Sequence, residues 1–219
     1  MMKYKYILFD LDGTVSESAE GIRRSLEYAI GTLGAPMPDL DDYTLYIGPP
    51  LIDTFLNLVG LDPVTAEQGA ELYRSYYNSR GKYLNRVYEG IPALLERLGR
   101  EEVKLAICTS KFERFAEEIL DILGIRSLFD SVCGSNLDGS RKDKKDLIPY
   151  AVAQLGGDIE RDREQVVMLG DTWFDAKGAR LCGVDFIGAA YGYGAIPAMA
   201  EQGAKAFADS PGELFDLLR

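Results

Sequence analysis

The sequence predicts an α/β fold: a doubly wound, mainly parallel sheet with an α-helical cap domain inserted after the first strand. Three observations lead to this prediction. Short apolar runs of strand length recur along the 219 residues, and each is followed by turn residues and a helical pattern. This alternation is interrupted once, between Thr14 and about Gly90, by helical patterns alone. A chain of this length can bury a full core and still carry a modest insertion.

The expected strands are short and separated by amphipathic helices. They cover residues 6–9, 103–108, 131–133, 166–169, 185–188 and 205–208. The helical pattern of residues 112–123 ends at Gly124, where a left-handed C′ glycine belongs. The last helix opens with Ser210, Pro211 and Glu213, which fit a capping box with proline at the first helical position. Such alternation is typical of a parallel sheet covered by helices on both faces.

The interrupted stretch carries two helical stripes and no convincing strand. One stripe consists of Ile22, Leu26, Ala29, Ile30 and Leu33, and the other of Leu72, Tyr73, Tyr76 and Tyr77. Proline and glycine punctuate the stretch at residues 34–36 and 48–50. We therefore predict a core of residues 1–15 and 88–219 and a helical cap domain of residues 16–87.

The composition excludes several chemistries. The chain has no histidine, so Ser-His-Asp hydrolysis, histidine phosphotransfer and His-ligated zinc are impossible. A net charge of -11 argues against nucleic acid or an anionic membrane as partner. No apolar run approaches the roughly 20 residues of a membrane span, and the run before Asp10 is too short for a signal sequence. We expect a cytoplasmic protein, a monomer or homodimer, with Cys108, Cys133 and Cys182 reduced.

Two acidic motifs follow expected strands. Asp10 and Asp12 follow the first one, and at i and i+2 on an extended chain their side chains project to the same side. Asp171 and Asp175 follow the strand at residues 166–169 and lie one above the other at a helix start. Each motif alone has a structural interpretation, an Asp-Gly turn for the first and a Thr172–Asp175 capping box for the second.

Together the two motifs predict a metal site. The carboxyl ends of parallel strands meet at one edge of the sheet, where ligands bind. Converging carboxylates at about 4 Å repel by roughly 4 kcal/mol per pair at an effective dielectric constant of 20, so they need a counter-ion. Carboxylate oxygens without histidine or cysteine favour Mg²⁺, and Mg²⁺ would attract phosphate oxygens.

Two further segments could bind phosphate. Thr109 and Ser110 end the strand at residues 103–108, and Ser110 with Glu113 fits a capping box whose helix N-terminus would attract an anion. A basic run precedes the helix expected at 146–155; one of its ammonium groups turned inward would stabilise phosphate, although most of the run is expected to be solvated. The run contains Arg141, Lys142, Lys144 and Lys145.

These pieces, in this order, resemble the haloacid dehalogenase superfamily of aspartate-nucleophile phosphatases, whose core is Rossmann-like, and most closely its phosphoglycolate phosphatase-like members. The Tyr46–Pro50 segment is similar to a 5′-nucleotidase subgroup. The resemblance covers essentially the whole chain. Asp10 and Asp12 match the first motif of the superfamily, Thr109 the second, a lysine the third, and Asp171 with Asp175 the fourth.

The resemblance implies a role for each matched residue. Asp10 would be the nucleophile, and Asp12 would protonate the leaving oxygen and then activate water, with its carbonyl also on Mg²⁺. Thr109 and Ser110 would hold phosphoryl oxygens. Lys144 is the expected third-motif lysine because the residues around it resemble relatives, with Lys142 and Lys145 as alternatives. Asp171 would bind Mg²⁺ and Asp175 would orient Lys144 or a metal-bound water. As substrate contacts from the cap side we expect Lys111, Arg23 and Gly48.

The expected function is thus Mg²⁺-dependent hydrolysis of a small phosphomonoester metabolite, phosphoglycolate or a 5′-nucleotide, through an aspartyl-phosphate. A sugar-phosphate phosphatase or phosphomutase of the same fold is an alternative. Asp12 argues against dehalogenation, since dehalogenases lack this aspartate. Glu17 stands where relatives usually have aspartate. Two rivals differ in kind: a cysteine-dependent phosphatase using Cys108 and Arg114, which lacks the glycines of a phosphate loop, and a non-enzymatic sensor, which would not need the Asp10–Asp12 pair.

Overall fold

The molecule is built around one parallel sheet with helices on both faces. The computed structural model describes residues 2–138 and 141–219. The sheet has the order β5-β4-β1-β6-β7-β8 and every pairing in it is parallel. Its strands are β1 (Tyr6–Phe9), β4 (Lys104–Phe112), β5 (Ser131–Ser135), β6 (Val166–Gly170), β7 (Asp185–Ala189) and β8 (Ala206–Ala208). All six strands expected from the sequence are confirmed, and the doubly wound order places β1 at the point where the chain reverses direction across the sheet.

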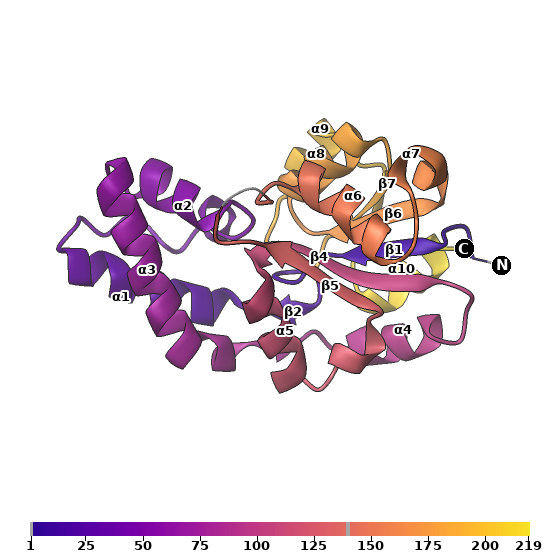
Figure 1. Cartoon of the computed structure of the whole chain (residues 1–219), viewed down its shortest axis with the longest axis horizontal. Coiled ribbons are helices and arrows are strands. Elements are labelled where there is room, and N and C mark those ends of the chain that lie inside the picture. Colours follow the sequence, from indigo (N-terminus) through magenta and orange to yellow (C-terminus); the bar gives the residue numbers. More distant parts are fainter. Residues whose placement is uncertain (1, 139–140) are drawn as a thin grey trace.

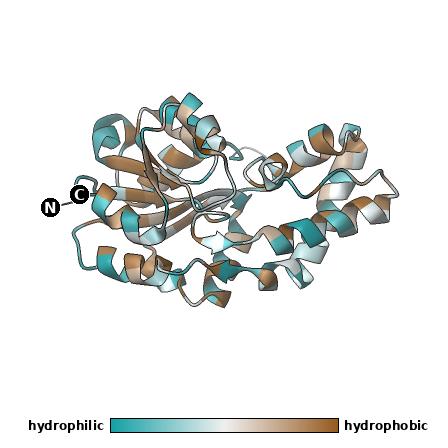
Figure 2. Ribbon diagram, turned by 180° about the vertical axis from the view of Figure 1, so that it is seen from behind, coloured by the Kyte–Doolittle hydropathy of each residue, from teal (hydrophilic) through white to brown (hydrophobic). Residues whose placement is uncertain are grey.

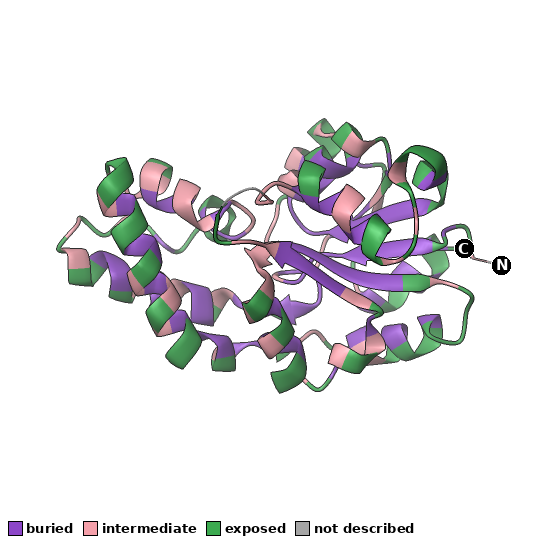
Figure 3. Cartoon of the chain, in the orientation of Figure 1, coloured by how far each residue is buried: buried purple, intermediate pink, exposed green. Residues whose placement is uncertain are grey.

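Alternate residues of the central strands supply the two apolar layers. Ile7 and Phe9 of β1 join the cluster on one face, while Tyr6 and Leu8 join the cluster on the other. The first face is covered by α4 (Ile91–Leu98), α5 (Glu113–Ile122) and α10 (Pro211–Leu217). The second is covered by α6 (Lys144–Gln154) and α8 (Trp173–Cys182), with α7 (Ile159–Asp162) and α9 (Ile196–Glu201) beside them (Figure 1). The central strands are buried along their length, as Figure 3 shows.

The segment between β1 and β4 is a helical insert that extends away from the carboxyl edge of the sheet (Figures 1 and 2). It contains α1 (Ala19–Leu33), α2 (Leu51–Asp53), which continues as a π-turn at Thr54–Leu58, and α3 (Pro63–Ser79). Helices α1 and α3 lie side by side, with Tyr28 stacked on Tyr76 at 4.9 Å. Both predicted stripes face the interior of this insert, with Ile22, Leu26, Tyr73 and Tyr77 buried.

The absence of strands in this region was a wrong prediction. Strand β2 (Ser16–Glu17) leaves the sheet region and β3 (Arg86–Val87) returns to it, and the two pair antiparallel. Each is only two residues long, too short for an alternating pattern to be visible in the sequence. Their positions coincide with the borders that we predicted at residues 15–16 and 87–88, and the division into core and cap at these borders remains our proposal.

Two predicted capping boxes do not form. Strand β4 runs on to Phe112, so Ser110 lies in the strand; the N-cap of α5 is Phe112, and the Glu113 carboxylate instead accepts the Gly134 N–H at 3.0 Å. At α10 the Ser210 side chain makes no cap hydrogen bond, and Glu213 accepts the Asp209 N–H. In the described part of the chain, no helix combines the length and apolar character that crossing a bilayer requires.

Candidate active site

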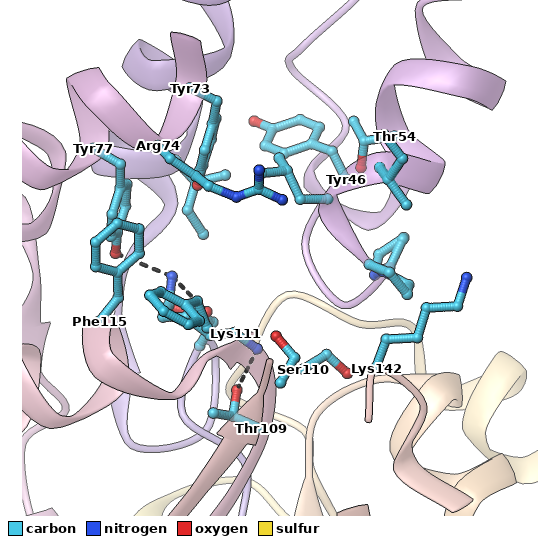
Figure 4. Close-up of a pocket in the computed structure, with 18 of the residues that line it drawn as sticks. Tyr46, Thr54, Tyr73, Arg74, Tyr77, Thr109, Ser110, Lys111, Phe115 and Lys142 are labelled. Carbon is cyan, nitrogen blue, oxygen red and sulfur yellow. Dashed lines mark hydrogen bonds and ion pairs between the residues drawn. The ribbon is translucent and has the colours of Figure 1, made fainter. Parts of the chain in front are cut away.

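A cavity of about 230 Å³ lies between the carboxyl edge of the sheet and the insert. Asp10, Asp12 and the end of β4 line it from the sheet side, and α3 with the turn at residues 46–52 lines it from the insert side. Figure 4 shows this arrangement, with Thr109, Ser110 and Lys111 below and Tyr73 and Arg74 above. Residues that are far apart in sequence thus face one space.

Three carboxylates meet beside this cavity. Asp10, Asp171 and Asp175 each offer one oxygen, these oxygens lie within 4.8 Å of one another, and all three residues are buried. Asp10 follows β1 and Asp171 follows β6, and parallel strands present their carboxyl ends at one edge of the sheet; Asp175 lies in the first turn of α8. The fourth predicted member, the Asp12 carboxylate, lies outside this group.

Lys144 is the buried cation of the cluster. Its Nζ lies 2.9 Å from Asp10 Oδ1 and 2.6 Å from Asp175 Oδ1, and it donates a hydrogen bond to the Cys108 carbonyl at 2.7 Å. Three oxygens therefore surround the ammonium group, and the Cys108 carbonyl is the one that accepts a well-directed hydrogen bond. In this arrangement Lys144 would reach a phosphoryl oxygen only by releasing one of them.

The other two candidate lysines lie elsewhere. Lys142 is half-exposed at the rim of the cavity, 3.8 Å from Asp53, and Lys145 is exposed on α6. Gly178 of α8 allows the close approach of Lys144, since a Cβ there would lie 2.3 Å from the Lys144 Cβ.

The charge of the cluster calls for a cation. With all three carboxylates ionised, the three carboxylates and one ammonium have a net charge of −2 in a buried space. Burial raises the pKa of Asp171 well above its usual value, and the neighbouring Asp175 and Asp10 raise it further. Burial lowers the pKa of Lys144, but Asp10 and Asp175 outweigh this, so its pKa is raised and the ammonium stays charged. Asp10 Oδ1 and Asp175 Oδ1 are buried and lack a well-directed hydrogen bond, although Lys144 lies at ion-pair distance. These oxygen donors fit a hard divalent ion such as Mg²⁺.

Asp171 and Asp175 are held in different ways. Asp171 accepts the Tyr193 N–H at 2.8 Å and the Thr14 hydroxyl at 3.2 Å. Asp175 accepts the Thr172 N–H at 3.1 Å and the Thr172 hydroxyl at 2.7 Å, so the predicted capping box is present. Asp175 therefore caps α8 with one oxygen and faces Lys144 with the other. No pattern in the sequence indicated Thr14 or Tyr193 as partners of Asp171.

Gly13 forms a tight turn directly after the first-motif residues, and its backbone packs against Asp171. Its φ is +81°, and a Cβ at this position would lie 2.1 Å from Asp171 Oδ2. Both the backbone conformation and the close approach therefore require glycine here.

The Asp12 carboxylate is bound to Lys111 instead of joining the cluster. Lys111 Nζ lies 3.0 Å from Asp12 Oδ2 and donates to the Tyr77 hydroxyl at 3.0 Å, and its side chain is only 8% exposed. Asp12 Oδ1 is buried and accepts no hydrogen bond from the described residues. Lys111, predicted as a substrate contact, thus connects Asp12 to α3 of the insert. Figure 4 shows its bond to Tyr77 of α3.

The remaining predicted contacts divide into two groups. Thr109 is buried and accepts the Lys111 N–H at 3.3 Å, and Thr109, Ser110 and Gly48 all line the cavity. Gly48 has φ +110°, and a Cβ there would lie 3.0 Å from Thr172 Cγ2, so the turn at 48–50 packs on the fourth motif. The predicted substrate contact by Arg23 is not supported by the structure. Arg23 does not line the cavity, and its guanidinium is paired with Glu27 and Asp41 at 2.9 Å each.

The sequence reasoning missed Arg74. This residue of α3 lines the cavity, and Figure 4 shows its guanidinium extending across the space near Tyr46. No ion pair to Arg74 occurs among the described residues, in contrast to Arg23. The sequence places Arg74 two helical turns after Glu67 on α3, but it does not show which face of α3 is turned toward the sheet.

Cys108 does not have the environment of a nucleophile. It is fully buried in the apolar cluster under α6, and burial raises the pKa of its thiol. The Arg114 guanidinium is paired with Glu118 at 2.9 Å. Neither residue of the cysteine-dependent phosphatase alternative is therefore positioned for catalysis.

Comparisons with known proteins agree with this geometry. The sequence model of a family described as haloacid dehalogenase-like hydrolase matches residues 7–189. A protein named 5′-nucleotidase from Pseudomonas aeruginosa is 39% identical over 193 residues, which cover 88% of this chain and 86% of that protein. A protein named phosphoglycolate phosphatase from Aquifex aeolicus is 31% identical over 189 residues, which cover 86% of this chain and 86% of that protein.

Two further relatives extend the comparison. Tyrosine-protein kinase PtkA of Mycobacterium tuberculosis is 40% identical over 188 residues; the match covers 86% of this chain but only 62% of that protein. A crystal structure from Clostridium acetobutylicum, described as a predicted phosphatase, superposes with a TM-score of 0.91 at 35% identity and covers 98% of this chain and 97% of its own.

Proposed function

The chain belongs to the haloacid dehalogenase-like hydrolase family, and on this basis we propose that it is a Mg²⁺-dependent phosphatase that acts on a small phosphomonoester metabolite through an aspartyl-phosphate on Asp10. One observation carries the proposal: three buried carboxylates and one buried lysine gather at the edge of the sheet, beside a cavity large enough for a metabolite.

Asp10 is the proposed nucleophile. It is buried apart from the face that lines the cavity, and Lys144 holds its Oδ1. The other oxygen attacks phosphorus in line, the bond between phosphorus and the ester oxygen breaks, and the aspartyl-phosphate forms. A water molecule then attacks that phosphorus, inorganic phosphate leaves, and the Asp10 carboxylate is restored.

Asp12 is the proposed acid and base. It gives a proton to the leaving alcohol oxygen in the first step and takes one from the attacking water in the second. In the structure Lys111, at the end of β4, holds its carboxylate at 3.0 Å. Thr109 and Ser110 are placed to donate hydrogen bonds to phosphoryl oxygens, which carry the developing charge.

Asp10, Asp171 and Asp175 would hold the metal ion, with Asp12 contributing its backbone carbonyl. When bound, Mg²⁺ supplies charge stabilisation to the phosphoryl oxygens and neutralises the net charge of −2. Thr14 and Tyr193 keep the Asp171 carboxylate oriented toward its neighbours.

Among candidate substrates, the cavity favours a nucleoside 5′-monophosphate over phosphoglycolate. The insert side presents the aromatic rings of Tyr46, Tyr73 and Tyr77, and Phe115 of α5 lies beside them at the core side. The insert also presents the carboxylate of Glu67 and the guanidinium of Arg74, which has no ion-pair partner among the described residues. A nucleobase offers an apolar ring face and an edge with both donors and acceptors, and can use all of these groups. Phosphoglycolate offers only a carboxylate, which would use Arg74 and leave the rings without a partner.

The chemistry is tested with a generic chromogenic phosphate ester. The wild type should release phosphate in the presence of Mg²⁺ and stop in EDTA, and Asp10→Asn should lose activity by about a factor of 10⁴ or more. Asp216→Asn, a change of an exposed carboxylate on α10, is the matched control and should keep full activity. Equal rates in the two variants would remove Asp10 from the mechanism, and no turnover of any ester by the wild type would favour the sensor alternative.

The substrate class is tested by Arg74→Met. We expect KM for a nucleoside 5′-monophosphate to rise about tenfold or more, as for the loss of a hydrogen bond to a charged group, with little change for the generic ester. Arg23→Met is the control, because that arginine also lies on the insert but outside the cavity. If phosphoglycolate is hydrolysed far better than every nucleotide, the assignment of substrate class is wrong while the phosphatase chemistry stands.

Transfer of the phosphoryl group from Asp10 to a protein tyrosine is a second candidate. It is favoured by the 40% identity to PtkA, a protein named as a kinase, of which this chain matches 62%. Hydrolysis transfers the phosphoryl group to water and releases inorganic phosphate, whereas transfer to a protein leaves it on the tyrosine oxygen. Incubation with radiolabelled phosphodonor and a tyrosine-containing acceptor protein distinguishes them, since only transfer gives acid-stable, alkali-stable label on the acceptor.

A further inference from the structure

The loop between β7 and α9 connects the acidic cluster to the insert through Tyr193. The Tyr193 N–H donates to Asp171 Oδ2 at 2.8 Å. Two glycines bring the loop this close: a Cβ on Gly192 would lie 2.3 Å from the Asp171 Cβ, and a Cβ on Gly194 would lie 1.9 Å from the Asp171 carbonyl oxygen. The backbone of this loop is therefore packed directly on Asp171.

The side chain of the same residue reaches the start of the insert. The Tyr193 hydroxyl accepts the Ser18 N–H at 2.7 Å and the Ala19 N–H at 3.0 Å. These are the N-cap and first residue of α1, a 15-residue helix whose own N-cap side chain makes no capping bond. Ser18 Oγ is buried without a hydrogen-bond partner among the described residues. A tyrosine more than 170 positions away in sequence thus takes the place of a local cap.

The segment that leads from the insert back to the core also packs against this loop. Tyr88 follows β3, and its N–H donates to the Val15 carbonyl at 3.1 Å, which ties the two crossings together. Its ring packs against Tyr191 at 5.1 Å, and the Tyr191 hydroxyl donates to the Thr14 carbonyl at 2.9 Å. Burial raises the pKa of Tyr88, and the adjacent Tyr193 hydroxyl raises it further. Tyr193 therefore touches both chain crossings and Asp171.

We propose that Tyr193 is a positioning residue that couples a divalent ion at the Asp171 cluster to the placement of the insert over the cavity. An ion that fixes the Asp171 carboxylate also fixes the backbone at Tyr193, and the hydroxyl transmits this to the first turn of α1. The inference rests on the proposed metal site, but it does not depend on the identity of the substrate or on turnover.

Hydrogen–deuterium exchange tests the coupling directly. In the wild type, we expect Mg²⁺ to slow exchange of the peptide covering residues 16–26, relative to EDTA, by about threefold or more. In Tyr193→Phe this effect of Mg²⁺ should disappear, because the hydroxyl is lost. Mg²⁺ should still raise the melting temperature of Tyr193→Phe as in the wild type, because the backbone N–H to Asp171 remains. Tyr43→Phe, which removes a hydroxyl from the ring packed on Tyr193 at 5.6 Å, is the control and should retain the Mg²⁺ effect.

The kinetic readout separates positioning from general stability. In Tyr193→Phe, KM for a nucleoside 5′-monophosphate should rise about tenfold, and KM for the small generic ester, which does not reach the insert, should rise far less. The proposal is overturned if Mg²⁺ protects residues 16–26 equally in Tyr193→Phe and the wild type, or protects them in neither. A wild type without phosphatase activity but with Tyr193-dependent protection by Mg²⁺ would refute the proposed function and leave this inference standing.

Discussion

Lys144 is the residue whose replacement should affect the molecule most, and Lys144→Met isolates its charge. Methionine keeps an unbranched, flexible side chain of similar length in the space under β4. The change leaves Asp10, Asp171 and Asp175 in place with no cation among them. With all three carboxylates ionised and no metal bound, the net charge of the cluster then goes from −2 to −3.

The magnitude follows from two distances. At 2.9 Å from Asp10 and 2.6 Å from Asp175, each ion pair has an attraction of about 6 kcal/mol at an effective dielectric constant of 20. Much of this attraction is offset by the desolvation of a side chain that is only 4% exposed. Removing one partner of such a buried network typically costs roughly 3–5 kcal/mol, because the remaining charges stay buried. At an m-value of about 2–3 kcal/mol/M in urea, the unfolding midpoint should fall by about 1–2.5 M.

The assay is urea unfolding followed by fluorescence, in EDTA and in Mg²⁺. Lys145→Met, one residue further along α6 and exposed, is the matched control and should shift the free energy of unfolding by less than about 0.5 kcal/mol. Mg²⁺ should recover about half of the loss in Lys144→Met, since a dication lowers the uncompensated charge of the cluster from −3 to −1. Activity should fall at least about a hundredfold, since Asp10 loses the group that holds it.

One result would refute this reasoning. If Lys144→Met and Lys145→Met unfold at the same urea concentration in EDTA, the ion pairs contribute nothing to stability and the cluster does not carry the proposed charge. A loss of stability that Mg²⁺ leaves unchanged would show that the cation and the lysine do not share the same carboxylates.

Three further predictions concern the metal, a glycine and a thiol. Because burial and the neighbouring carboxylates raise the pKa of Asp171, this group binds its proton more tightly in the folded metal-free protein than in the unfolded chain, so its contribution to stability falls as pH rises above the unfolded value of about 4. The increase in melting temperature caused by Mg²⁺, which binds the ionised form, should therefore be larger at about pH 8 than at about pH 5, and an increase independent of pH would contradict it. Gly13→Ala and Gly34→Ala both place a Cβ at positive φ, +81° and +67°, and Gly34→Ala, whose Cβ meets nothing within 4 Å, should lose about 1 kcal/mol of stability. At Gly13 the Cβ would also clash with Asp171, so Gly13→Ala should lose more stability than Gly34→Ala, and only Gly13→Ala should lose activity and stabilisation by Mg²⁺. Iodoacetamide should leave the phosphatase activity of the native protein intact while EDTA abolishes it, since Cys108 is fully buried with a raised pKa; inactivation by labelling at Cys108 would reverse this conclusion.

The elements of the sheet could be predicted because they depend on local patterns that the fold obeys. The strands of the core are apolar runs bounded by turns, and the motif residues at their carboxyl ends meet at one edge by the geometry of a parallel sheet. Asp10 and Asp171 are 161 positions apart and lie in one cluster for this reason. Lys144 was preferred over its neighbours from family resemblance, and its burial between Asp10 and Asp175 agrees with that choice.

What the sequence could not give depends on contacts between distant segments. The capping box expected at Ser110 and Glu113 is locally favourable, but Glu113 is bound by Gly134 and Arg141, which lie 21 and 28 positions away. Arg23 and Arg74 both lie on amphipathic helices, and only the docking of α1 and α3 decides which of them faces the cavity. Tyr193 gave no signal because its two roles, through the N–H and the hydroxyl, exist only after the loop packs on Asp171.

The pairing of β2 with β3 has a consequence for how this protein could change over time. Ser16 is opposite Val87 and Glu17 opposite Arg86, so the chain leaves and re-enters the core at neighbouring positions. A segment anchored in this way can be lengthened, shortened or replaced by an unrelated one, and each doubling of its length adds only about 0.6 kcal/mol of closure entropy. The catalytic groups on the sheet would stay where they are. Selectivity could therefore be exchanged as a unit, by grafting another segment onto the same two-stranded stem.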